Sequence, residues 1–243
     1  MAVQDVARSQ EGVLDRLKAM EVAMVQMETT KRVDDLERRM TEVENGKKDV
    51  DHRRVEMHGP VAVKLAKELQ TRNVRDFSFH RVTEDYYEQT LEQRGQQLGA
   101  KRVEQLCKSI VLENTQAGDE VKGCTDPKNS KYYLVVVQYC KRFNAELIRS
   151  FVYAMNKDKG VSKRKFNFRL CPEEVSHALT GYGHNAVTPI GMNESIPIIL
   201  SKSVKELVEG YFWLGAGEVD LKLGLNTQQF IKAYDPFICD CAF

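Results

Sequence analysis

The chain has no long apolar run, and none of its 243 residues lie in a stretch approaching the roughly 20 residues that a membrane-spanning helix needs. Its first residues lack the basic-then-apolar order of a secretory signal. The 6 cysteines form no Cys-x-x-Cys pair, and the histidines lack the spacing of metal ligands. We therefore expect a cytoplasmic protein that needs no metal or other cofactor. The net charge of +1 means that any contact with nucleic acid needs a local basic patch.

Three familiar catalytic or nucleotide-binding motifs are also missing. The sequence holds no Gly-x-Ser-x-Gly nucleophile turn, no phosphate-binding P-loop and no Gly-x-Gly-x-x-Gly after a strand. Cys107 offers a thiol beside Lys108, but a cysteine in a buried strand is usually inert. Common nucleophilic hydrolases and nucleotide-binding folds are thus disfavoured.

Residues 1–58 contain no proline and little glycine, and their apolar residues recur at intervals of three and four. The repeat comprises Leu17, Met20, Met24 and Met27, followed in a shifted frame by Val33, Leu36, Met40 and Val43. This pattern predicts a helical, coiled-coil-like arm, with a single helix docked on its own domain as the alternative. Either structure could serve docking on a partner, and the first could form a homodimer.

Residues 59–235 alternate short apolar strands with short helices after the break at Gly59-Pro60. We expect strands near 76–81, 107–112, 132–139, 166–170, 196–200, 211–214 and 219–225. Helices are expected near 61–70, 83–99, 145–155, 172–181, 204–208 and 227–234. The order predicts an α+β domain, with a mixed sheet or a partly closed barrel surrounded by short helices. Residues 236–243 are expected to form a loosely held tail.

Residues 180–191 read Thr-Gly-Tyr-Gly-His-Asn-Ala-Val-Thr-Pro-Ile-Gly and contain little bulky apolar material. Glycines allow a backbone to approach another group closely, and Pro189 restricts the turn just before Gly191. The segment is therefore either a functional loop or an ordinary connector between buried elements.

Several separate features, in the same order, make the chain resemble the YbaK/ProX aminoacyl-tRNA deacylases, which are related to the editing domains of prolyl-tRNA synthetases. Leu179–Tyr182 and Val187–Gly191 resemble the glycine loop of that family. Cys107–Val111 resembles its lysine strand, and Gly215–Leu223 resembles its closing segment. The resemblance runs from about Asp76 to Tyr234.

The resemblance implies hydrolysis of mischarged aminoacyl-tRNA, with a small residue such as alanine or cysteine on the proline tRNA. Lys108 matches the functional lysine of the family and would hold the terminal adenosine phosphate or polarise the ester carbonyl. Asp220 falls on the family's acidic position and would orient Lys108 or the α-ammonium of the amino acid. Backbone amides of the loop, including those of Ala186 and Gly191, are expected to stabilise the oxyanion. Substrate binding is assigned to His80, Asn185, Val187, Thr188 and Pro189.

The loop departs from the family pattern at one point. Bacterial members often carry two glycines where this chain has Asn185 and Ala186. Asparagine tolerates left-handed backbone geometry and alanine is small, so the turn can form. The alternative is a catalytically silent module that binds tRNA or a synthetase and is recruited through its helical arm.

A basic run of Lys163, Arg164 and Lys165 leads into Phe166 and Phe168. It could hold the acceptor stem of a tRNA. The other interpretation is a solvated turn before a strand whose phenylalanines lie in the core.

Overall fold

The computed structural model describes residues 52–243, and the helical arm expected for residues 1–58 lies almost entirely outside them. Helix α2 (His52–Glu56) and helix α3 (Pro60–Thr71) open the described part. Gly59 lies between them with a φ of 92°, which glycine adopts without strain, and Pro60 starts α3. The predicted helix start at this proline is confirmed.

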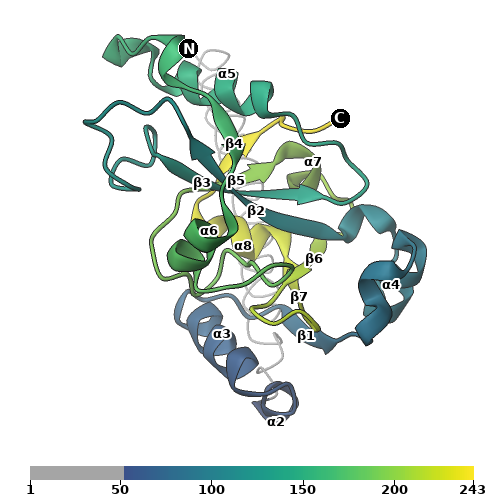
Figure 1. Ribbon diagram of the computed structural model, residues 1–243. Helices are drawn as coiled ribbons and strands as arrows, with labels where there is room; N and C mark the ends of the chain where they lie inside the picture. The colour runs from purple at the N-terminus through teal and green to yellow at the C-terminus, as the bar shows by residue number, and fades with distance from the viewer. Residues whose placement is uncertain (1–51) are drawn as a thin grey trace, which may run out of the picture. The chain divides into compact units, whose positions relative to one another are not determined.

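The strands of the described residues form two sheets (Figure 1). The larger sheet has the order β4 (Phe168–Leu170), β2 (Cys107–Asn114), β3 (Tyr132–Gln138), β5 (Ile198–Ser201) and β8 (Phe237–Cys239). The smaller has the order β1 (Phe77–Arg81), β7 (Leu221–Asn226) and β6 (Tyr211–Gly215). The larger sheet is mixed, because β3, β5 and β8 run parallel while β2 is antiparallel to β3 and β4. The α+β class with a mixed sheet is confirmed, and the strands do not close into a barrel.

Short helices surround the sheets. They are α4 (Leu91–Leu98), α5 (Ala145–Met155), α6 (Glu173–Thr180), α7 (Lys202–Lys205) and α8 (Thr227–Tyr234), with 3₁₀ turns η1 (Glu84–Glu88), η2 (Val103–Gln105), η3 (Lys157–Lys159) and η4 (Lys163–Lys165). The Asn144 side chain caps helix α5 by accepting a hydrogen bond from the Glu146 amide, and the helix expected near 145–155 is confirmed. No helix in residues 52–243 is long and apolar enough to cross a membrane.

The central strand β3 is buried on both faces and separates two apolar clusters. Helices α3, α6 and α8 pack in one cluster, and α5 packs in the other. Side chains of β2 alternate between them: Cys107 and Val111 join the first cluster, while Leu112 joins the second. This alternation decides where each side chain of β2 can act.

The helix expected for residues 83–99 is divided into η1 and α4. The Thr90 hydroxyl accepts from the Gln93 amide at 3.3 Å, and the Gln93 side chain accepts from the Thr90 amide at 2.9 Å. This reciprocal capping box starts a new helix, so the single long helix is wrong.

The expectation of a loose tail at residues 236–243 is also wrong. Strand β8 pairs in parallel with β5, and Cys241 is fully buried. An isolated bridge joins Phe143 to Ala242. The tail is held because it covers an edge of β5 that would otherwise be open.

Candidate active site

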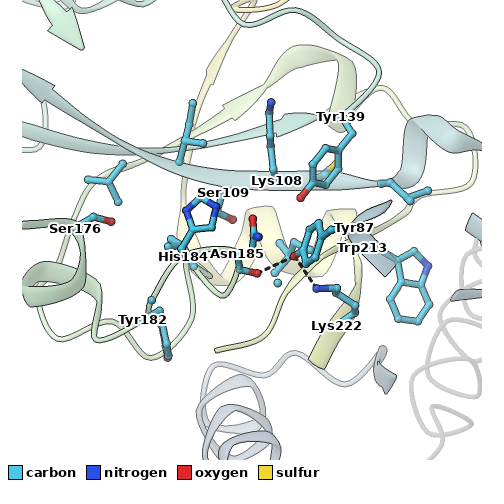
Figure 2. Close-up of a pocket in the computed structure, with 18 of the residues that line it drawn as sticks. Tyr87, Lys108, Ser109, Tyr139, Ser176, Tyr182, His184, Asn185, Trp213 and Lys222 are labelled. Atoms are coloured by element: carbon cyan, nitrogen blue, oxygen red, sulfur yellow. Dashed lines mark hydrogen bonds between the residues drawn. The ribbon is translucent and has the colours of Figure 1, made fainter. Parts of the chain in front are cut away.

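A cavity of about 550 Å³ lies beside β2, between the loop that follows α6 and strands β6 and β7 (Figure 2). Its volume is in the range of small-molecule binding sites. Polar groups reach its lining from four segments of the chain: Tyr87, Lys108, Ser109, His184, Asn185 and Lys222. No group of potential metal ligands occurs among residues 52–243.

The loop after α6 is closed by one tyrosine. Gly181 ends the helix with a φ of 79°. The Tyr182 hydroxyl then reaches across the loop to the carbonyl oxygens of Ile190, at 2.7 Å, and Gly191, at 3.0 Å. This buried tyrosine joins the two ends of the segment and fixes the span between them.

The bend within the loop is set by backbone hydrogen bonds. Asn185 is left-handed, with a φ of 61°. The Ala186 amide donates to the Gly183 carbonyl at 3.1 Å, and the Ala186 carbonyl accepts from the Gly217 amide at 2.9 Å. The C=O and N–H of one trans peptide point in opposite directions, so the Val187 amide is directed away from Gly217. Since Val187 lines the cavity, its amide is a candidate donor to a ligand.

Other backbone amides of the bend also lack an acceptor within the described part of the chain. His184 and Asn185 line the cavity, and neither they nor Val187 donate a backbone hydrogen bond to another residue of the described part of the chain. His184 and Asn185 are exposed, so their amides can bind water, whereas Val187 is half-buried and its unpaired amide is costly unless a ligand or water accepts from it. The bend is therefore suited to bind a developing negative charge.

Ser109 and Lys108 leave β2 on opposite faces (Figure 2). The Ser109 hydroxyl oxygen is buried, with no hydrogen-bond partner in the part of the chain that the structure describes. The Lys108 amine lies 5.6 Å from the centre of the Tyr139 ring. Ser109 was not singled out from the sequence, although a hydroxyl beside the lysine of a strand was the available signal.

Lys222 is the second residue that sequence analysis missed. Its side chain is 3% exposed, and its amine donates to the Tyr87 hydroxyl at 2.9 Å and to the Val219 carbonyl at 2.7 Å. Burial lowers its pKa to about 8. In the segment Leu221–Leu225 a lysine between leucines is typical of a solvent-facing position, and no local signal shows that η1 covers this face.

The structure does not bring Asp220 to Lys108. Both Asp220 carboxylate oxygens accept from one Arg81 nitrogen, at 2.8 and 2.7 Å, and Glu218 binds the same guanidinium. The hydrogen bond to Asp220 is the main reason that the pKa of Arg81 is raised. Asp220 is thus engaged on the surface and does not line the cavity.

The remaining predicted residues divide in the same way. Asn185 and Val187 line the cavity with Lys108, whereas the Ala186 amide donates its hydrogen bond within the turn. Thr188 and Pro189 are buried outside the cavity lining. Two others lie elsewhere: His80 pairs with Lys222 across β1 and β7, and Gly191 packs toward Leu65 of α3. Lys163, Arg164 and Lys165 form the exposed turn η4, away from this cavity.

Comparisons with known proteins place these observations in one family. The family model for the aminoacyl-tRNA editing domain matches residues 87–233. This interval contains the loop after α6 and strands β2, β6 and β7, which line the cavity. The search of curated protein sequences found no significant match.

Solved structures share the fold. A candidate trans-editing enzyme for prolyl-tRNA synthetase aligns with a TM-score of 0.55 and 18% identity, over 76% of this chain and 98% of that one. A scaffold protein from computational epitope-backbone grafting gives 0.55 and 17%, over 76% and 98%. A hypothetical protein gives 0.53 and 16%, over 74% and 99%.

Proposed function

Because the chain belongs to the aminoacyl-tRNA editing domain family, we propose that it hydrolyses the ester of a mischarged aminoacyl-tRNA in the cavity described above. One observation carries the proposal: residues with unpaired backbone amides, His184, Asn185 and Val187, line the same cavity as Ser109, whose hydroxyl has no partner in the described part of the chain. These are the groups that an ester carbonyl needs when its oxygen gains negative charge.

The reaction needs no protein nucleophile, because an aminoacyl ester is already activated. A water molecule attacks the carbonyl carbon, the bond to the ribose oxygen breaks, and a proton from the water passes to that oxygen. The products are the free amino acid and a tRNA with its terminal hydroxyls restored. The Val187 amide stabilises the oxyanion, which is worth about 10²–10³ in rate for one such donor. The Ser109 hydroxyl holds the water or adds a second donor.

Lys108 is given the role of a phosphate anchor. Its side chain leaves β2 on the face opposite Ser109, which favours contact with the terminal nucleotide over contact with the ester carbonyl. A lysine amine binds phosphate as a point charge. Asp220 has no direct part in this scheme, because Arg81 holds it outside the cavity.

The substrate we propose is a small amino acid, such as alanine or cysteine, on the proline tRNA. The family resemblance supports this choice, and so does the structural similarity to a candidate trans-editing enzyme for prolyl-tRNA synthetase. A pocket separates side chains by only about 1–3 kcal/mol per methylene, so a synthetase that errs benefits from a second, separate site. Such a protein would act in the cytoplasm beside its synthetase.

A silent binding module remains the second candidate. Asn185 and Ala186 replace glycines that bacterial relatives often carry, and Ala186 brings a buried methyl group to the bend. If this methyl excludes the acyl group, the domain binds tRNA or a synthetase without hydrolysing the ester.

A panel of mischarged tRNAs separates the two functions. The wild-type protein is expected to accelerate ester loss from at least one small-residue substrate. Ser109→Ala should lower kcat/KM at least tenfold, since it removes a buried polar group from the reacting centre. Lys108→Ala should raise KM more than it lowers kcat, and Lys205→Ala, on the exposed surface of α7, should change neither. No ester loss with any substrate would assign the silent function.

A further inference from the structure

A line of hydrogen bonds joins three segments of the cavity lining that are distant in sequence. The Lys222 amine on β7 donates to the Tyr87 hydroxyl on η1 at 2.9 Å. The Tyr87 hydroxyl in turn donates to the Asn185 carbonyl at 2.9 Å. Figure 2 shows both contacts side by side, with Tyr87 between the lysine and the loop.

We propose that Lys222 and Tyr87 form a brace that holds the Asn185 carbonyl against the cavity wall and so keeps the amides of the bend available to a ligand. Lys222 acts through Tyr87 and is therefore a positioning residue. The inference deepens the proposed function and rests on it only for its effect on turnover, because the brace itself is a property of the loop.

The Asn185–Ala186 peptide is held at both ends. Its carbonyl accepts from Tyr87, and its N–H donates to the Gly183 carbonyl. The hydrogen bond from the Ala186 amide to the Gly183 carbonyl closes a turn whose third residue is the left-handed Asn185, so the Asn185 carbonyl leaves the turn just after its left-handed residue. Without the hydroxyl of Tyr87 only the N–H end of this peptide would be held. The Asn185 carbonyl could then tilt toward a bound ligand, where its oxygen would repel an oxyanion.

The positive charge of Lys222 strengthens the hydrogen bond from Tyr87 to Asn185. The amine is buried, and no acidic side chain within residues 52–243 forms an ion pair with it. An unpaired buried cation lowers stability, so its position is not explained by folding alone. A cation that donates to a phenol oxygen polarises the O–H bond, which strengthens the donation from Tyr87 to Asn185.

The brace also has a pH range. The groups around Lys222 are the rings of Tyr86 and Tyr87, Asp220 just before β7, and Arg94 of α4, with His80 opposite it on β1. Burial, which is the largest effect, lowers its pKa to about 8. As pH rises through this value the amine loses its charge, and the hydrogen bond from Tyr87 to Asn185 weakens.

Amide hydrogen exchange of the intact chain tests the brace without requiring activity. In Lys222→Met and Tyr87→Phe, exchange at the Ala186 and Gly217 amides should be roughly threefold to tenfold faster, the effect of one lost hydrogen bond. The matched control Lys205→Met should leave both rates unchanged. The Tm of Lys222→Met should stay constant or rise, because an unpaired buried cation has been removed.

Unchanged exchange at both amides in both variants would overturn the proposal. So would a lower Tm for Lys222→Met with faster exchange throughout the domain, because that pattern describes a general structural role. A kinetic readout adds a second check: wild-type kcat/KM should fall as pH rises through about 8, and Lys222→Met should lack this fall. The amino group of the substrate titrates in the same way with both proteins, so a difference between their two pH profiles reports the titration of Lys222. If the amides respond as expected but the wild type hydrolyses no ester, the brace stands and the proposed function fails.

Discussion

Asn185 stands where related loops often carry glycine, yet asparagine suits the backbone geometry of this position. Its φ of 61° lies where glycine has no penalty, asparagine has a small one, and a β-branched residue is strained. Because the side chain is exposed, packing does not obscure this backbone preference.

We therefore expect Asn185→Val to lower the free energy of unfolding by about 1–2 kcal/mol and Asn185→Gly to change it by less than about 0.5 kcal/mol. Urea denaturation measures both. Asn73 provides a matched control, since it has a φ of 66° outside the cavity. Asn73→Val should cost similar stability yet leave ester hydrolysis intact, whereas Asn185→Val should reduce hydrolysis as well. Equal hydrolysis by the two valine variants would separate the bend from catalysis.

Some properties of single residues could be predicted from the sequence, and others depended on residues far away in the chain. The tolerance of Asn185 for left-handed geometry follows from its chemistry alone and is confirmed. Lys222 could not be identified in this way, because alternation with leucines assigns it to solvent until η1 is known to cover it. The role expected for Asp220 depended on a partner, and Arg81, which lies 139 positions away, takes that place.

Elements with complete local signals were predicted well. Helix α5 has its asparagine cap and an apolar face, and β3 is an unbroken apolar run, so neither requires knowledge of distant residues. The capping box at Thr90 was a local signal that the longer periodic pattern obscured. Strand β8 could not be predicted from Phe237–Cys239 alone, because three residues become a strand only beside the open edge of β5.

Strand β8 therefore makes a specific prediction about the C-terminal segment. Deleting residues 236–243 uncovers β5, and removes Cys239 and Cys241 from the core. Loss of these buried contacts should cost at least about 3 kcal/mol and lower the Tm clearly. Phe243→Ala is the control, because Phe243 is 62% exposed and the substitution keeps its two backbone hydrogen bonds with Arg142. A full deletion with an unchanged Tm would mean that β8 contributes nothing to the sheet.

At the scale of the whole molecule, charge is nearly balanced, and the basic run at η4 is a local feature. Edge strand β4 runs from this turn to the cavity. Turn η4 ends at Lys165, shortly before β4 begins, and Leu170 at the end of β4 lines the cavity. Arg169 between them is exposed. The acceptor end of a tRNA could thus follow β4, with its phosphates on η4 and its ester at the bend.

This path predicts a change in the salt dependence of tRNA binding. Each phosphate contact to single-stranded nucleic acid contributes about 0.7 to the slope of log K against log salt, so replacing Lys163, Arg164 and Lys165 by glutamine should reduce the slope by about 2. A control triple at Lys64, Lys67 and Lys205, which are exposed on α3 and α7, removes equal charge elsewhere. Equal slopes for the two triples would show that only net charge matters. A lower slope for the η4 triple, with kcat unchanged at saturating tRNA, would identify η4 as the surface that positions the tRNA while the cavity hydrolyses the ester.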